Sequence, residues 1–376
     1  QVAMSDAPAV VQCIPSMAGG GAERQFIYLT RGLVSRGWRV TAVVTHAGPH
    51  YEELKQSGAR IVRPAAVTNY DPRLFFEVRR IIRDERPSLV QTWLLQMDVF
   101  GGLAALCSAV PWILSERSHE ACYQRSLKYR LRETLARHAS AIIANSCGGD
   151  AYWRTRVGVG TVRRVIPNGV PLEAIEAATP FASSEIGIPD DAHVVLLAGR
   201  RSPEKNWGAL VLALDSVLRR RPAVLVFCGA GLDSGGLPRK LADEHGVHRV
   251  RVLGHVSDIW RWMKRADVFV SVGLFEGRPN TVLEAMASGC PLVVSDIPSH
   301  REFLDESTSV FVDPRRSAAI ALGIETCLVD PQSAKDRSAR ARGAVAQWSV
   351  GRMVTAYEEL YHDLIRADRG LRGAGS

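Results

Sequence analysis

Short apolar segments of strand length alternate with longer amphipathic segments along this chain. Strands that are bounded by glycine or proline and separated by helix-length segments form parallel sheets with helical crossovers. The sequence therefore predicts an α/β fold built from repeated strand–helix units. Ten strands are predicted, at residues 9–14, 40–45, 88–93, 112–115, 141–144, 194–198, 223–228, 250–253, 268–272 and 292–295.

The predicted strands fall into two series, and 376 residues are enough for two domains. The turn signal Pro167-Asn168-Gly169 and a stretch rich in Ala and Ser separate the two series. We place an N-terminal domain at residues 1–172, a C-terminal domain at 173–350, and a terminal helix with a frayed tail at 351–376. The apolar residues of that helix recur at helical spacing: Met353, Tyr357, Leu360, Tyr361 and Leu364.

Composition favours a cytoplasmic protein. The longest apolar candidate, residues 100–114, contains Pro111 and is too short to cross a bilayer. No charged-then-apolar signal segment is recognisable at the start. The seven cysteines include no Cys-x-x-Cys pair, which favours reduced thiols.

The net charge of +8 is concentrated in the first half of the chain. Residues 1–172 contain 22 Lys and Arg against 13 Asp and Glu, whereas residues 173–376 contain 25 against 26. A basic half favours an anionic partner, such as phospholipid, a diphosphate-linked acceptor or nucleic acid. An arginine-rich solvated surface is the alternative.

A helix is predicted at residues 123–138, with Leu127, Leu131 and Leu135 forming a stripe among basic residues. Two interpretations stay open. A basic amphipathic helix can lie on an anionic membrane. Alternatively, the leucine stripe faces the core and the basic face is solvated.

Two glutamates, Glu276 and Glu284, stand eight positions apart around a loop that contains Gly277 and Pro279. Glu276 follows a predicted strand, at a place where no helix needs a cap. Glu284 has a structural alternative, because Thr281-x-x-Glu284 has the spacing of a helix capping box. The loop runs directly into Ala-Met-Ala-Ser-Gly-Cys-Pro.

Two cations, Arg200 and Lys205, lie around a turn at Pro203 after another predicted strand. Arginine offers a planar fork of donors and lysine a compact charge. Taken alone, they are two surface cations in a loop. The chain contains no Asp-x-Asp, so the usual carboxylate site for a divalent metal on a nucleotide-sugar is missing.

Together, the paired glutamates and the Gly-Arg-x-x-x-x-Lys spacing resemble the donor half of retaining family 4 (group 1) glycosyltransferases. The resemblance covers nearly the whole chain and is strongest over residues 194–314. It implies a GT-B fold, in which two Rossmann-like doubly wound domains face a central cleft. The N-terminal domain would bind the acceptor and the C-terminal domain the nucleotide-sugar, and the last helix would cross back to the N-terminal domain.

The resemblance also implies roles for single residues. Arg200 and Lys205 would hold the diphosphate and stabilise the negative charge that grows on it as it leaves. Glu276 would bind hydroxyls of the donor sugar and face its anomeric carbon, and Glu284 would bind the ribose. The rest of the donor loop would contact the sugar or phosphate: Gly277, Pro279, Asn280 and Thr281. No cofactor and no divalent metal are expected.

The glycine run Gly19-Gly20-Gly21 follows the first predicted strand and precedes a helix. Glycines permit close approach to a ligand, and a helix N-terminus offers N–H groups to an anion. A dinucleotide-binding fingerprint fails, because its sixth position is Arg24 and no acidic residue follows the second strand. A merely tight strand–helix turn is the alternative. The resemblance implies that this loop faces the donor diphosphate.

His119 follows the strand predicted at residues 112–115. By resemblance, this histidine lies over the donor sugar and stabilises charge during transfer. A lone histidine is otherwise a surface or packing residue, and that alternative stays open.

We predict a hexosyltransferase that moves a sugar from a nucleotide-sugar, by resemblance a UDP-sugar, with retained configuration and without metal. The acceptor would be a saccharide, either free or linked to a polyprenyl diphosphate, in bacterial surface polysaccharide assembly at the inner face of the plasma membrane. A nucleotide-sugar epimerase of the same fold is the first alternative. A non-catalytic protein that binds polyanions or membranes is the second; no aromatic and basic RNA motif supports nucleic acid as the partner.

Overall fold

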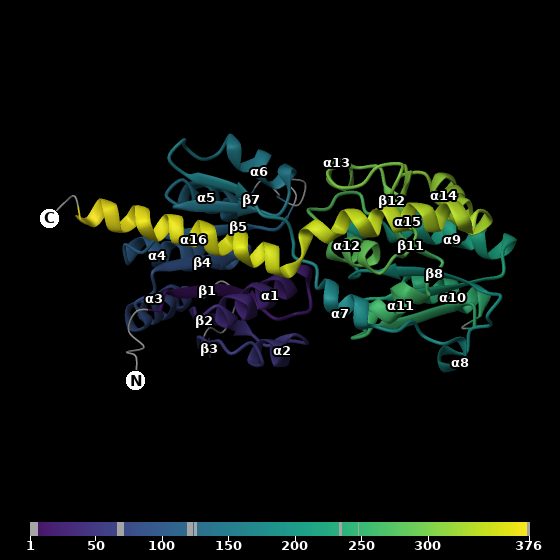
Figure 1. The fold of residues 1–376 in the computed structure, drawn as a ribbon, viewed down its shortest axis with the longest axis horizontal. Coiled ribbons are helices and arrows are strands. Elements are labelled where there is room, and N and C mark those ends of the chain that lie inside the picture. The colour runs from purple at the N-terminus through teal and green to yellow at the C-terminus, as the bar shows by residue number, and fades with distance from the viewer. Residues whose placement is uncertain are drawn as a thin grey trace. The chain divides into compact units, whose positions relative to one another are not determined.

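The computed structural model describes residues 7–65, 71–118, 123, 126–232, 235–246 and 248–373. The chain divides into two compact units, one formed by residues 1–169 with 350–376 and the other by residues 170–349. Each unit contains its own parallel sheet and is described separately (Figure 1).

The first unit has a seven-stranded parallel sheet with the order β3-β2-β1-β4-β5-β6-β7. In the register of the central strands, Val10 pairs with both Val40 and Leu89. The strands are β1 Ala9–Ser16, β2 Arg39–His46, β3 Arg60–Val62, β4 Leu89–Trp93, β5 Trp112–Glu116, β6 Ala141–Ala144 and β7 Val162–Val165. The helices are α1 Gly21–Ser35, α2 Tyr51–Lys55, α3 Arg73–Glu85, α4 Leu94–Cys107, α5 Leu127–Ala136, α6 Cys147–Arg154 and α16 Val350–Gly373.

Helices cover both faces of this sheet. Helices α1 and α16 pack together on one face, and α3, α4, α5 and α6 contribute to the apolar cluster on the other. The apolar stripe predicted for the last helix is buried in the first cluster, so α16 belongs to the core of this unit. At its edge, Glu358 accepts hydrogen bonds from Trp38 Nε1 at 2.9 Å and from Arg36 at 2.7 Å.

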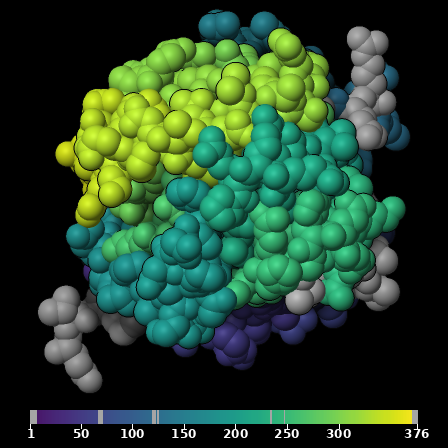
Figure 2. Space-filling view, turned by 90° about the vertical axis from the view of Figure 1, so that its right-hand side faces the viewer, coloured from purple at the N-terminus to yellow at the C-terminus, as the bar shows by residue number. Residues whose placement is uncertain are grey.

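The second unit has a six-stranded parallel sheet with the order β10-β9-β8-β11-β12-β13. Its long helices α14 and α15 contact each other, and Figure 2 shows this part of the chain in yellow-green on the surface. The strands are β8 His193–Ala198, β9 Ala223–Cys228, β10 Val250–Gly254, β11 Val268–Ser271, β12 Leu292–Ser295 and β13 Val310–Val312. The helices are α7 Leu172–Ala177, α8 Ser183–Ile186, α9 Trp207–Arg220, α10 Leu237–His245, α11 Ile259–Arg265, α12 Asn280–Ala287, α13 Pro298–Arg301, α14 Ser317–Val329 and α15 Pro331–Val345.

All ten predicted strands are present, and the sequence prediction missed three others, β3, β7 and β13. Each of the three is an edge strand of its sheet. Central parallel strands are buried on both faces and appear as continuous apolar runs, whereas edge strands lack that signal. Strand β7, for example, reads Val-Arg-Arg-Val and is partly exposed.

The leucine stripe predicted on residues 123–138 does not face the core. In α5 the Leu127 and Leu131 side chains are 82% and 45% exposed, whereas Arg132 is buried. The interpretation with the stripe in the core is therefore wrong for these two leucines, and only Leu135 packs partly against the core.

Arg132 is buried because two buried carboxylates hold it. Its Nε donates to Asp98 Oδ2 at 2.7 Å and its Nη1 donates to Glu116 Oε2 at 3.0 Å. The remaining acceptor positions are also used: Thr92 donates to Asp98, while Trp153 Nε1 and the Tyr123 hydroxyl donate to Glu116. Burial raises the pKa of Asp98 to about 6. One cation thus balances two carboxylates inside the first unit.

Replacing Arg132 with Met should destabilise the first unit by roughly 3–5 kcal/mol, because the change leaves two buried carboxylates without their cation. Urea unfolding followed by tryptophan fluorescence measures the loss. The matched control is Arg130→Met, which changes an exposed arginine two residues earlier in the same helix. Equal stabilities for the two variants would show that the buried cluster contributes nothing.

Candidate functional site

The carboxyl ends of β8 and β11 mark the point where the strand order of the second sheet reverses. From β8 the chain adds β9 and β10 on one side, and then β11, β12 and β13 on the other. In open parallel sheets, ligands bind in the crevice outside this reversal point. The segments that follow β8 and β11 are tied together there, because Leu274 N donates to Glu204 O at 2.8 Å and Asn206 Nδ2 donates to Val272 O at 3.1 Å.

Lys205 and Glu276 meet across this point. Lys205 Nζ lies 2.6 Å from Glu276 Oε1, although the two residues are 71 positions apart in the sequence. Their side chains are 19% and 11% exposed, so the pair is mostly enclosed yet still open to a ligand. Lys205 ends a short 3₁₀ turn, Pro203–Lys205, and Glu276 follows β11. The structure thus brings together the two motifs on which the family resemblance depends.

Arg200 precedes the same turn, directly after Gly199 at the end of β8. Its side chain is exposed, and its carbonyl accepts a hydrogen bond from Trp207 Nε1 at 3.3 Å. Burial acts to raise the pKa of the Glu204 carboxyl, but a hydrogen bond from Ser202 and, to a smaller extent, the charges of Arg200 and Lys205 lower it below its ordinary value. Two cations therefore stand at the end of β8, one paired and one exposed.

Glycines mark the ends of three neighbouring strands at this edge: Gly199 directly follows β8, Gly229 directly follows β9, and Gly254 is the last residue of β10. Gly229 N donates to Gly254 O at 2.5 Å, and Gly199 N donates to Cys228 O at 3.0 Å. A β-carbon on Gly229 would lie far inside van der Waals contact with the Gly199 carbonyl oxygen. The backbones can approach this closely only without side chains, and sequence reasoning did not single out Gly229.

Glu284 lies inside α12 rather than at its cap. The helix begins at Asn280, its N-cap is Pro279, and no side chain caps it. The capping-box interpretation of Thr281 and Glu284 is therefore wrong. Glu284 is buried and its Oε2 accepts a hydrogen bond from Trp260 Nε1 at 3.2 Å.

The first residues of α12 are Asn280 and Thr281, and Gly277 and Pro279 immediately precede them. The first turn of a helix has backbone N–H groups without partners inside the helix, which favours an anion nearby. The donor loop predicted from the sequence is thus the entry to a helix that begins beside Glu276. The contacts of these four residues with a donor stay a prediction.

Arg278 has a structural role that the sequence did not reveal. It is buried, and its guanidinium lies 4.3 Å from the ring centre of Trp348 and 4.8 Å from that of Phe303. Stacking of this kind is favourable for arginine and anchors the loop between Glu276 and α12.

His300 is a second residue that sequence reasoning missed. It follows β12, it is fully buried, and its Nδ1 lies 2.8 Å from Ser295 O, so this nitrogen is the donor. Within the described part of the chain, its Nε2 has no hydrogen-bond partner. Burial lowers the pKa of His300, and the charges of Glu276 and Lys205 act on it in opposite directions. A neutral histidine therefore stands behind the paired charges.

In the first unit, the glycine run forms the turn between β1 and α1. Gly19 has a φ of +95°, Gly20 is the N-cap, and α1 begins at Gly21. A β-carbon on Gly20 would collide with the carboxylate of Glu23, which is itself buried. The turn thus has the geometry expected from the sequence, and its contact with a donor stays a prediction. His119 lies outside the described residues.

The carboxyl end of β5 is occupied by structural contacts. Glu116, its last residue, belongs to the buried Arg132 cluster. The Arg117 guanidinium lies 4.2 Å from the ring centre of Trp93, donates to Asn168 Oδ1 at 3.0 Å and also bonds the Tyr357 hydroxyl. Each of these side chains is therefore engaged within the first unit.

Two family descriptions match the chain and together span most of it. Residues 19–174 match "Glycosyltransferase Family 4", and residues 170–344 match "Glycosyl transferases group 1". With two parallel sheets and flanking helices, the architecture is that of the GT-B class. The chain belongs to the group 1 glycosyltransferases and is a transferase enzyme.

Individual relatives agree with this assignment. The chain is 28% identical over 335 residues to the putative glycosyltransferase EpsF of Bacillus subtilis, covering 84% of this chain and 86% of the relative. It is 24% identical to UDP-Gal:alpha-D-GlcNAc-diphosphoundecaprenol alpha-1,3-galactosyltransferase of Escherichia coli, covering 76% and 78%. The crystal structure of Anabaena Alr3699/HepE in complex with UDP and glucose shares the fold, with a TM-score of 0.83, 19% identity and coverage of 95% and 100%.

Two further observations concern membrane-spanning helices and the cysteines. No helix among the described residues has both the length and the apolar character needed to span a membrane. The described cysteines are free thiols, without a disulfide among them.

Replacing Gly229 with Ala should destabilise the second unit by at least about 2 kcal/mol, because the new methyl group forces β8 and β9 apart at their ends. The matched control is Gly208→Ala, where a β-carbon within helix α9 meets no atom within 4 Å. The control should gain up to about 1 kcal/mol from helix propensity. Thermal unfolding of both variants checks the contrast, and a Gly229→Ala protein as stable as the control contradicts the packing argument.

Proposed function

We propose that this enzyme transfers a hexosyl group from a UDP-sugar to a lipid-linked saccharide, with retained anomeric configuration and without a divalent metal. The observation that carries the proposal is the Lys205–Glu276 pair at the strand-order reversal of the second unit. The relative from Escherichia coli supports the donor and acceptor classes, because its name specifies UDP-Gal and a diphosphoundecaprenol-linked acceptor.

The Lys205–Glu276 pair suits a nucleotide-sugar donor, because the diphosphate of such a donor is an anion that can replace Glu276 as the partner of Lys205. In the ligand-free pair, Lys205 is neutralised by Glu276. A diphosphate that enters beside Arg200 would take over the ammonium and free the carboxylate to accept hydrogen bonds from sugar hydroxyls. Lysine and arginine then stabilise the diphosphate more as it departs than while it is still esterified. This is the role a metal plays in other nucleotide-sugar sites.

The bond changes need no enzymatic base. The bond between the anomeric carbon and the β-phosphate oxygen breaks, and its electron pair stays on the phosphate. The acceptor hydroxyl attacks the same face of the sugar and forms the new glycosidic bond. Because attack and departure take place on the same face, the configuration is retained, and the proton of the acceptor hydroxyl passes to the departing phosphate oxygen.

The buried Glu284 would bind the ribose from within α12, held by Trp260. His300 would keep the floor of the site neutral behind Glu276. Under this proposal, Arg200 and Lys205 bind the diphosphate, and Glu276 binds and orients the sugar.

Replacing Lys205 with Met should lower kcat at least 100-fold, because charge on the leaving group is no longer stabilised. Initial rates with a panel of UDP-sugars and a polyprenyl-diphosphate-linked saccharide measure the effect. The control is Lys240→Met, an exposed lysine of α10 whose loss should leave the rate unchanged.

The same assay tests the remaining features of the proposal. Added EDTA should not change the rate, and a rate abolished by EDTA and restored by Mg²⁺ overturns metal independence. Full turnover by Lys205→Met overturns the role of the pair. Conversion of the donor to an epimer without acceptor would instead identify a nucleotide-sugar epimerase.

We also propose that α5 contacts an anionic membrane surface, where lipid-linked acceptors reside. Leu127 and Leu131 are exposed on a helix that also carries Lys128 and Arg130 and has Arg137 as its C-cap. Basic helices with exposed leucines bind the interface by burying apolar side chains and by attraction to acidic lipids.

Replacing Leu127 and Leu131 with Ser should weaken binding to vesicles of phosphatidylglycerol and phosphatidylcholine by about tenfold or more, since each leucine that enters the interface contributes on the order of 1–2 kcal/mol. Vesicle co-sedimentation measures this. The control replaces Leu212 and Leu322, exposed leucines of the second unit, with Ser. If both double variants sediment like the parent protein, α5 does not contact the membrane.

A further inference from the structure

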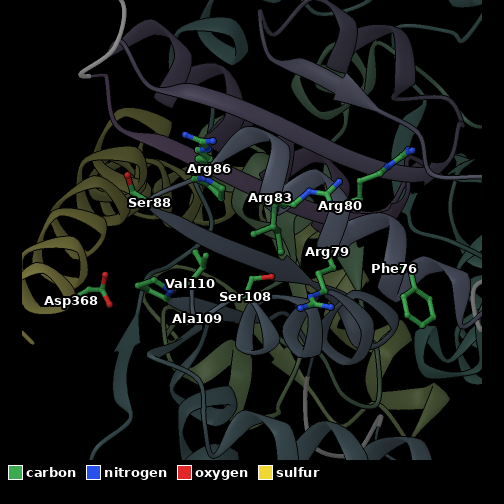
Figure 3. A pocket seen from close by; sticks show the side chains of 13 residues that line it. Phe76, Arg79, Arg80, Arg83, Arg86, Ser88, Ser108, Ala109, Val110 and Asp368 are labelled. Carbon is green, nitrogen blue, oxygen red and sulfur yellow. The ribbon is translucent and has the colours of Figure 1, made fainter. Parts of the chain in front are cut away.

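A hollow of about 700 Å³ opens in the first unit at the amino ends of β4 and β5 (Figure 3). Pro87 and Ser88 precede β4, and Val110 and Pro111 precede β5, so both strand starts form its floor. Strand β4 has five residues, and at about 3.3 Å per residue the hollow lies roughly 16 Å along the sheet from the carboxyl end of that strand. Ligands of doubly wound sheets bind at carboxyl ends, so this hollow is separate from such a site.

Four arginines and one carboxylate, that of Asp368, line the hollow; the arginines are Arg79, Arg80, Arg83 and Arg86. All four arginines belong to the last turns of α3 or its C-cap, and all are exposed. Arg80 pairs with Glu77 at 2.7 Å and Arg83 pairs with Asp84 at 3.2 Å. Within the described residues, the guanidinium groups of Arg79 and Arg86 have no hydrogen-bond or ion-pair partner. The hollow therefore offers two guanidinium groups that are fully available to a ligand.

Helix stability alone does not account for this cluster. A cation near a helix C-terminus is favourable, and either Arg83 or Arg86 alone would supply that effect. Arg79 and Arg83, however, are four positions apart, where like charges destabilise a helix. An anion between the guanidinium groups would offset this repulsion.

The lining also matches one ligand chemistry. A guanidinium group can donate two parallel hydrogen bonds to two oxygens of one phosphate, and every cation of the cluster is arginine rather than lysine. Ser88 and Ser108 line the hollow and add hydroxyl donors. Phe76, with its side chain 65% exposed, stands at the end of the row of arginines in Figure 3 and offers an apolar surface to whatever carries the phosphate. The volume suits a small molecule or a headgroup.

We propose that this hollow is a binding site for a phosphate-bearing anion, held by Arg79, Arg83 and Arg86. The site goes beyond the proposed glycosyl transfer and does not depend on it. Two sources present this chemistry, a free diphosphate compound or the headgroup of an acidic lipid.

Isothermal titration with inorganic diphosphate at low ionic strength tests the first source, and every protein carries Arg200→Gln and Lys205→Met so that the proposed donor site does not contribute. The variant carries Arg79→Gln, Arg83→Gln and Arg86→Gln. The control carries Arg39→Gln, Arg154→Gln and Arg164→Gln, three exposed arginines elsewhere in the same unit. Binding should be at least tenfold weaker in the variant and unchanged in the control, and thermal unfolding should show both proteins folded.

Vesicle co-sedimentation tests the second source. All proteins carry Leu127→Ser and Leu131→Ser, so that α5 does not contribute. Binding to phosphatidylglycerol vesicles that the arginine variant loses and the control keeps assigns the hollow to a lipid headgroup. Diphosphate binding that the variant loses assigns it to a free ligand. If the variant and the control bind diphosphate and vesicles alike, or if neither probe binds the parent protein, the proposal is overturned.

Discussion

The contact between Lys205 and Glu276 depends on the backbone more than on the charges themselves. The segments that follow the neighbouring strands β8 and β11 are joined by a main-chain hydrogen bond and by an amide hydrogen bond from Asn206, independently of the Lys205 and Glu276 side chains. Asn206, in a left-handed conformation, ends the 3₁₀ turn and reaches both Val272 O and Pro314 O. The carboxylate and the ammonium are therefore held in position without a donor, and rigid placement is what allows charged groups to stabilise a leaving group.

Sequence reasoning predicted the sheets well because central parallel strands are marked by continuous apolar runs. It also placed Lys205 and Glu276 in one site, since both follow strands in recognisable motifs. It failed where tertiary contacts override local pattern. Thr281 and Glu284 have the spacing of a cap, yet the helix begins one residue before Thr281, so that Glu284 becomes a buried partner of Trp260.

Helix α5 is a second place where tertiary contacts override the local sequence pattern. A row of leucines normally predicts a buried face, and a row of basic residues a solvated one. Here two carboxylates from α4 and β5 bind Arg132 inside the unit, and that requirement rotates the leucines outward. Asp98 and Glu116 lie far from α5 in sequence, so no local pattern could have revealed the inversion. Likewise, the close approach of Gly229 to Gly199 depends on strand neighbours that the sequence does not specify.

The burial of Asp98 has a thermodynamic consequence. The pKa of Asp98 is raised to about 6 in the fold, mainly by burial, against an ordinary value near 4 in the unfolded chain. Between these values the folded state binds more protons, so this carboxyl favours folding most in acid and progressively less as the pH rises toward 6. At Asp98, folding near pH 5 therefore takes up a proton. The heat of unfolding measured there will include the ionisation heat of the buffer that accepts the released proton.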